Sequence, residues 1–159
     1  MPGAAFLPTA LMAGGAADPS FRSARPLMDW AQARTLRRAG WTLGSHARTH
    51  PQLRGLSAAK ALDELRGSRE DLEQALGEPV DLLAYPYGTN QTVSPRDQRL
   101  AAEAGYRAAF MNMIAPLQVG QTDRLAIPRC KVLRGDSVWV LRGSLSGAMD
   151  GWRRIEARG

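Results

Sequence analysis

The pattern of apolar and polar positions predicts one prominent helix over residues 57–76. Leucines recur on one face of this segment at helical spacing. Opposite charges stand four residues apart at three places: Lys60 and Glu64, Arg66 and Glu70, and Arg69 and Glu73. Such pairs support a helix, and Gly77 followed by Pro79 is a typical C-terminal stop.

Three shorter helices are expected from their start signals. The first covers residues 26–39, with Pro26 in its first turn. The second follows Ser94, which forms a capping box with Asp97 three residues later. The third begins at about Asp136.

Short apolar runs between these helices are interpreted as buried strands. They are residues 4–12, with an irregular second half after Pro8, and residues 41–45, 82–85, 108–112 and 127–132. Strands that alternate with helices predict an α/β fold with a parallel sheet and helical crossovers. We expect a single domain over residues 1–150 and a charged tail over residues 151–159.

The formal net charge of +6 does not indicate a nucleic-acid partner. The basic excess is scattered over residues 96–159, and no aromatic residues alternate with a basic stripe, as a single-strand binding groove requires. We therefore expect no nucleic-acid binding.

Membrane and export signals are also missing from the sequence pattern. No stretch approaches the roughly 18 uninterrupted apolar residues of a transmembrane helix. Residues 1–17 are apolar but lack the basic start of a secretory signal, so we interpret them as folded chain.

His46 and His50 are the two histidines of the chain, and they follow the predicted strand 41–45. Ligand sites of parallel α/β folds collect at the carboxyl ends of strands. Two imidazoles four residues apart can face one ion when the chain between them turns, and neutral imidazole is a common zinc ligand. The spacing indicates metal binding. The alternative is that one histidine is buried and hydrogen-bonded while the other lies on the surface.

The surrounding residues resemble the polysaccharide deacetylase family, whose NodB-homology domain carries an H-x-x-x-H motif at a strand end. The resemblance covers about residues 4–135. It is carried by residues 40–46, 49–53, 65–80, 84–88, 103–110 and 123–129. It implies an incomplete, distorted (β/α) barrel and a hydrolase that removes N-acetyl or O-acetyl groups from a carbohydrate polymer, so the expected partner is an acetylated glycan. Family members often act on cell-wall or exported glycans.

The resemblance also implies roles for individual residues. His46 and His50 would bind a divalent ion, commonly zinc. The backbone N–H of Tyr87 would help to hold the oxyanion, and Pro86 with Tyr87 would contact the substrate. Apart from the resemblance, Ser45 and Thr49 are expected either to orient the histidines through hydrogen bonds or to satisfy the backbone of the loop.

Parts of the family pattern have no counterpart in this sequence. The family's first motif, T-F-D-D-G, supplies the general base and a third metal ligand, and it normally precedes the segment that resembles residues 4–12. Asp18 and Asp29 precede the histidines, but neither lies in a matching context. Ala84 stands where many members have an arginine that orients the base.

No histidine follows His50, so the family's late proton donor is also unmatched. Asp123 and Arg129 are candidate substitutes, with exposed salt bridges as their simpler role. Two hypotheses follow. Either the coding start lies upstream of Met1 and an in-frame first motif restores the carboxylates, or the chain is a non-catalytic remnant that binds carbohydrate or another partner.

Overall fold

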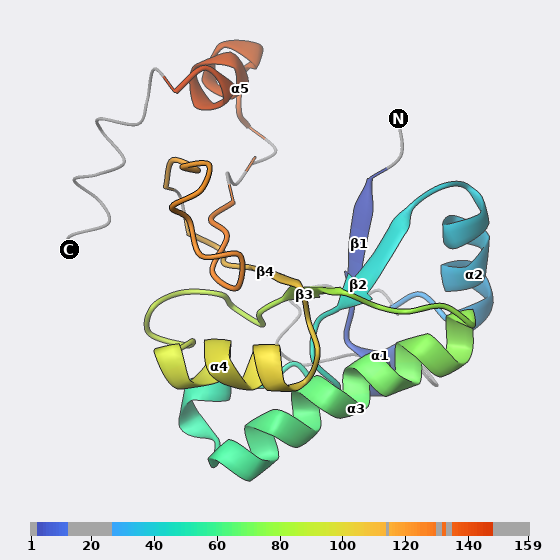
Figure 1. Ribbon diagram of the computed structural model, residues 1–159. Coiled ribbons are helices and arrows are strands. Elements are labelled where there is room, and N and C mark those ends of the chain that lie inside the picture. The colour runs from blue at the N-terminus through green and yellow to red at the C-terminus, as the bar shows by residue number, and fades with distance from the viewer. Residues whose placement is uncertain (1–2, 13–26, 114, 130–131, 133–134, 148–159) are drawn as a thin grey trace.

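The protein is described by a computed structural model over residues 3–12, 27–113, 115–129, 132 and 135–147. Four parallel strands form one sheet in the order β1-β2-β3-β4 (Figure 1). They are β1 (Ala4–Leu7), β2 (Thr42–Ser45), β3 (Leu82–Ala84) and β4 (Ala108–Phe110). Spatial order follows chain order, which confirms an incomplete (β/α) barrel. The sheet does not close on itself among the described residues.

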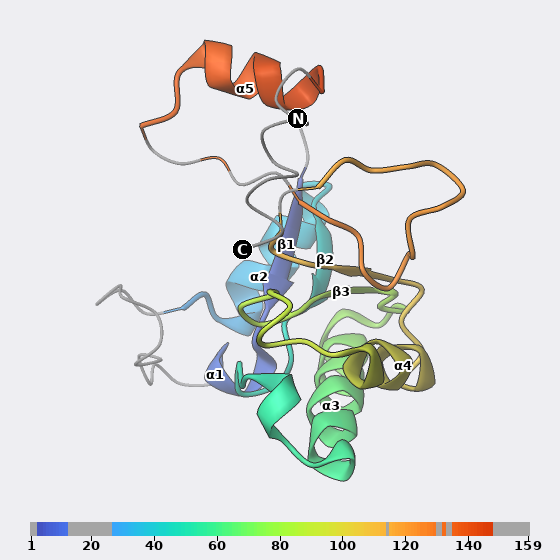
Figure 2. The same ribbon diagram turned by 90° about the vertical axis from the view of Figure 1, so that its left-hand side faces the viewer.

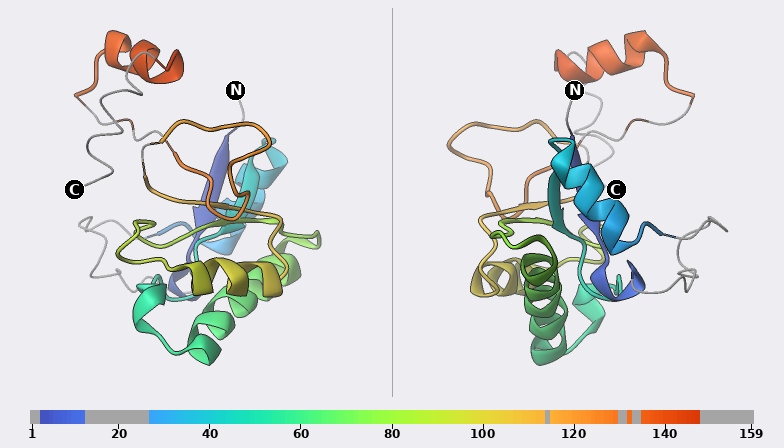
Figure 3. Two further views of the ribbon diagram at one scale, coloured as in Figure 1. Left: turned by 60° about the vertical axis from the view of Figure 1, so that its left-hand side comes forward. Right: turned by 90° about the vertical axis from the view of Figure 1, so that its right-hand side faces the viewer.

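Helices lie between successive strands, and one more helix follows β4. They are α1 (Thr9–Met12), α2 (Trp30–Arg38), the 3-10 turn η1 (Leu53–Gly55), α3 (Ala58–Leu76), α4 (Pro95–Glu103) and α5 (Val138–Leu145). Helices α3 and α4 lie side by side against one face of the sheet (Figures 1 and 3). Helix α2 packs on the same face, because its Ala33 shares a buried cluster with Leu72 of α3 and Leu43 of β2. Helix α5 stands apart from the sheet, beyond the loop that follows β4 (Figure 2).

The apolar face predicted for the long helix forms the core. Leu65 and Leu72 of α3 are fully buried. Leu65 belongs to a cluster with Leu83 beneath the sheet, and Leu72 belongs to a second cluster with Leu7 and Leu43. Helix α3 therefore packs against β3 at one end and against β1 and β2 at the other.

The predicted start of α2 at Pro26 was wrong, because the helix begins at Trp30. Asp29 decides the boundary. Its Oδ1 accepts a hydrogen bond from Gln32 N at 2.7 Å, and its own N–H donates to Gln32 Oε1 at 3.0 Å. This reciprocal cap satisfies two backbone donors of the first turn. Pro26 lies outside the described residues.

The predicted strand over residues 127–132 was also wrong. Only Ile127 pairs, through an isolated parallel bridge with Phe110. Ile127 bonds to this segment through both backbone groups, with Ala109 O at 2.9 Å and Met111 N at 2.8 Å, but Arg129 N donates to Met113 O at 3.0 Å and not to Met111 O, so the regular ladder does not continue. Cys130 and Lys131 lie outside the described residues.

The Ser94 signal was correct. Asp97 Oδ2 accepts hydrogen bonds from Ser94 N at 2.8 Å and Ser94 Oγ at 2.7 Å, and α4 starts at Pro95. The Asp97 side chain is fully buried and is paired with Arg96 at 2.6 Å. The cap thus fixes the end of the loop that leads from β3.

None of the helices in the described part of the chain is long and apolar enough to cross a membrane. The charged tail predicted for residues 151–159 falls outside that part.

Gly44 of β2 lies where the sheet leaves no room for an added methyl group. An added Cβ would lie 2.6 Å from Phe6 Cε1 and 2.9 Å from the backbone oxygen of Leu82. We expect Gly44→Ala to lower the free energy of unfolding by about 1–3 kcal/mol, as overpacking does in other cores. Urea denaturation measures this. Gly55→Ala is the matched control, because no atom lies within 4 Å of its added Cβ; equal losses in both variants would contradict the packing argument.

Candidate metal centre

His46 is held by two neighbouring strands at the carboxyl end of β2. Its backbone N–H donates to Leu7 O at 3.0 Å, which extends the β1–β2 pairing by one residue. Its ring Nδ1 lies 2.6 Å from Ala84 O, the last residue of β3. Since a carbonyl oxygen only accepts, Nδ1 carries the proton and Nε2 keeps its lone pair. His46 therefore presents the nitrogen that a metal ion would bind.

His50 is brought back to His46 by a tight turn. The two ring centroids lie 4.7 Å apart, with the ring planes at 64°. Ala47 and His50 adopt left-handed backbone conformations, with φ of 61° and 58°, which non-glycine residues rarely do. The turn thus brings together the two predicted ligands.

Burial lowers the pKa of the His46 imidazole to about 4, against the effect of the Ala84 hydrogen bond, which raises it; His50 and Arg129 lower it further. The ring is therefore neutral at neutral pH. A neutral imidazole is the form that coordinates metal ions.

This shift predicts a pH dependence of stability in the presence of a chelator. The folded-state pKa of His46 is below its ordinary value of 6.5, so its contribution to stability is complete above pH 6.5 and is lost as the pH falls towards 4. We expect His46→Gln to lose less unfolding free energy than the unmodified protein between pH 7 and pH 4.5 in urea titrations. An identical loss in the two proteins would contradict the shift.

The loop after β3 places Tyr87 next to the histidines. The Tyr87 and His50 ring centroids are 4.9 Å apart, and Tyr87 has a φ of 59°. Among the described residues, no hydrogen bond uses the backbone N–H of Tyr87. The side chain of Pro86 is fully buried, whereas that of Tyr87 is 37% exposed. This geometry favours Tyr87 over Pro86 as a substrate contact.

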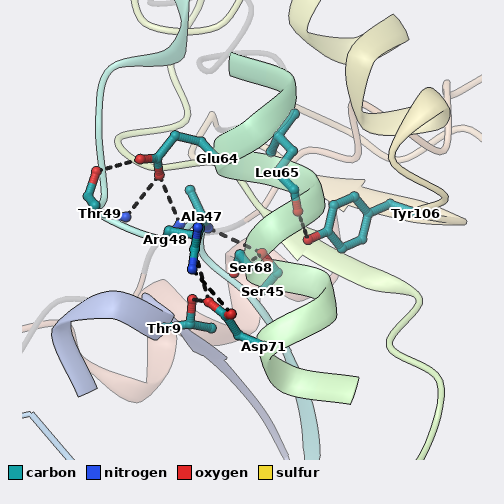
Figure 4. Close-up of polar contacts among 10 residues, drawn as sticks. All are labelled: Thr9, Ser45, Ala47, Arg48, Thr49, Glu64, Leu65, Ser68, Asp71 and Tyr106. Carbon is teal, nitrogen blue, oxygen red and sulfur yellow. Dashed lines mark hydrogen bonds and ion pairs between the residues drawn. The ribbon is translucent and has the colours of Figure 1, made fainter. Parts of the chain in front are cut away.

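Ser45 and Thr49 contact α3 (Figure 4). Ser45 Oγ donates to Ser68 Oγ at 2.8 Å and accepts from Ala47 N at 3.2 Å. Thr49 Oγ1 donates to Glu64 Oε1 at 2.7 Å. These bonds hold the turn that carries the histidines; whether they orient the imidazoles as predicted remains a prediction.

Glu64 and Asp71 of α3 also bind the turn that carries the histidines (Figure 4). The sequence interpretation did not connect these two residues with the site. Glu64 Oε2 accepts from the backbone N–H groups of Arg48 at 3.0 Å and Thr49 at 2.9 Å. Asp71 Oδ2 accepts from Arg48 Nε at 3.1 Å and Thr9 Oγ1 at 2.6 Å. A usable signal was the spacing of Glu64, Ser68 and Asp71, which puts three polar residues on one side of the helix.

The donor set fits a divalent ion in part. Two imidazole nitrogens are suitable zinc ligands. No group of three or more His, Cys, Asp or Glu side chains capable of holding an ion occurs among the described residues. Asp29 caps α2, and Asp18 lies outside those residues. The described chain thus offers two of the three protein ligands expected for an open site.

Within the part of the chain that the structure describes, the two suggested substitutes form hydrogen bonds with backbone groups. Asp123 Oδ1 accepts from Leu125 N at 2.8 Å. Arg129 Nε donates to Met111 O at 2.9 Å, and its guanidinium carbon lies 5.9 Å from the Phe6 ring centroid. Since Arg129 also lowers the pKa of His46, it lies near enough to place a positive charge beside the site.

The sequence was compared with protein families and with curated proteins. The sequence profile of polysaccharide deacetylases matches residues 4–109. A search of curated proteins finds no match.

Among solved structures, the Streptococcus pyogenes deacetylase PplD in complex with acetate has a TM-score of 0.75 and 20% identity, over 90% of this chain and 58% of that chain. IcaB from Ammonifex degensii has a TM-score of 0.69 and 16% identity, over 96% and 62%. BC0361, a polysaccharide deacetylase from Bacillus cereus, has a TM-score of 0.68 and 21% identity, over 77% and 38%. The chain spans less than two thirds of each of these proteins, and the likeness shows a common fold.

Proposed function

Because the chain belongs to the polysaccharide deacetylase family, we propose that it is a metal-dependent hydrolase that removes N-acetyl or O-acetyl groups from a carbohydrate polymer. The observation that carries the proposal is the convergence of His46 and His50, with ring centroids 4.7 Å apart at the carboxyl edge of the sheet. Zinc is the expected ion.

The proposed centre assigns distinct tasks to its residues. His46, through Nε2, and His50 would hold the ion. When bound there, a divalent ion would supply Lewis acidity, which acidifies a water molecule and polarises the acetyl carbonyl. The backbone N–H of Tyr87 would donate to the oxygen on which negative charge develops, a stabilisation of about 3–4 kcal/mol in comparable sites. The Tyr87 ring would contact the glycan.

The Streptococcus pyogenes deacetylase PplD, which has a similar fold, is described in complex with acetate, and acetate is the molecule that a deacetylation would release. The general base is the part of the proposal for which no residue of this sequence matches the family pattern.

A second candidate is a non-catalytic domain that binds the glycan without cleaving it. The observation in its favour is that the described residues contain no cluster of three metal-binding side chains. A carboxylate at this site would serve as the third ligand or the base, so a site with histidines alone could recognise an acetylated sugar and leave it intact.

Acetate release from an acetylated glucosamine oligomer separates the two candidates. We expect the 159-residue chain to release acetate in the presence of zinc and to stop when a chelator is added. Oligomer binding without acetate release would favour the non-catalytic candidate. A chain that neither binds nor cleaves the oligomer would contradict both.

A further inference from the structure

The turn that carries the two histidines needs support from outside itself. Ala47 and His50 hold left-handed backbone conformations with φ of 61° and 58°. Non-glycine residues keep such conformations only where surrounding contacts impose them. The elements that make these contacts therefore determine the position of His50.

The two histidines are supported by different parts of the fold. His46 is fixed by the sheet, through its N–H to Leu7 O and its Nδ1 to Ala84 O. His50 follows Arg48 and Thr49, and these two residues are tied to helix α3 (Figure 4). The backbone oxygen of Arg48 also accepts a hydrogen bond from Ala10 N of α1 at 2.9 Å. The spacing between the imidazoles therefore depends on how α3 and α1 lie against the sheet.

Glu64 makes the most concentrated of these ties. One carboxylate accepts three hydrogen bonds, from Arg48 N at 3.0 Å, Thr49 N at 2.9 Å and Thr49 Oγ1 at 2.7 Å. Two consecutive backbone N–H groups that point at one oxygen fix the direction of the chain between the histidines. Hydrogen bonds to an ionised acceptor are stronger than neutral ones, so a carboxylate holds this turn better than an amide would.

We propose that Glu64 is a positioning residue of the metal centre, which sets the place of His50 relative to His46 by holding the backbone of Arg48 and Thr49. This inference rests on the proposed metal binding by the two histidines. Glu64 acts through the turn, and it contacts neither the ion nor the substrate.

Zinc affinity provides the first test. We expect Glu64→Ala to bind zinc about 10- to 100-fold more weakly in calorimetric titrations well below its unfolding temperature, as loss of an outer partner does at other metal sites. Glu64→Gln keeps an acceptor of the same shape and should lose less affinity. Glu70→Ala removes the same charge from an exposed position of α3 and is expected to bind like the unmodified chain.

Imidazole NMR of the metal-free protein provides the second test, with a readout that a general loss of stability would not produce. The ring nitrogen signals of His50 should shift in Glu64→Ala, while those of His46, held by Ala84, should stay in place. If Glu64→Ala does not fold, Glu64→Gln carries both tests.

The outcomes separate this inference from the proposed function. Unchanged His50 signals, or unchanged zinc affinity in both Glu64 variants, would overturn the positioning role. If the unmodified chain does not bind zinc, metal binding fails, but the His50 signals still decide whether Glu64 places that ring.

Discussion

Replacing His46 or His50 with alanine is expected to lower the affinity for zinc at least about 100-fold, since loss of an outer partner alone typically costs 10–100-fold. Each variant would leave one imidazole where two converge with ring centroids 4.7 Å apart. Isothermal titration of the purified chain with zinc measures the change.

Gln52→Ala is the control for this titration. Gln52 lies two residues beyond His50, its side chain is exposed, and it makes no side-chain cap to the turn η1. Its variant should bind zinc like the unmodified protein. If the histidine variants bind zinc as tightly as Gln52→Ala does, His46 and His50 are not the zinc ligands.

Gly88→Ala is expected to lower the free energy of unfolding by about 2–5 kcal/mol, the second large effect. Gly88 has a φ of 65°, which costs an alanine about 1–2 kcal/mol. Its added Cβ would also lie 2.6 Å from Asn112 N, whose hydrogen bond to Gly88 O at 2.7 Å joins this loop to the end of β4. Backbone cannot move aside as a side chain can, so crowding adds about 1–3 kcal/mol.

Gly77→Ala separates the two causes. Gly77 has a φ of 72° at the end of α3, but no atom lies within 4 Å of its added Cβ. It should show the conformational cost without the crowding. Urea titrations in which Gly88→Ala loses no more stability than Gly77→Ala would contradict the proposed close contact between the Tyr87 loop and β4.

Much of the fold was predictable because its signals are local. The leucine spacing of α3, its stop at Gly77 and the Ser94–Asp97 box each lie within one segment, and each appears in the structure. The histidine pair was equally local, since it needs only a strand end and a turn. The approach of the rings to each other follows from that turn.

The features that were missed depend on contacts between distant segments. Glu64 was interpreted as a partner of Lys60 on the same helix, yet its carboxylate binds a turn fifteen residues earlier in the chain. That contact exists because α3 packs beneath β2, which helical spacing cannot show. The error after Ile127 has the same origin, because the regular ladder ends where Arg129 N donates to Met113 O, a contact between two segments that no local signal shows.

The central claim is that His46 and His50 bind one divalent ion together. Anomalous diffraction at the zinc edge, from crystals of this chain soaked in zinc, tests it most directly. The account predicts an anomalous peak about 2.0–2.1 Å from a ring nitrogen of each histidine, with Nε2 as the ligand of His46. A peak bound to one histidine alone, or a zinc-soaked crystal with no peak between the two rings, would contradict it.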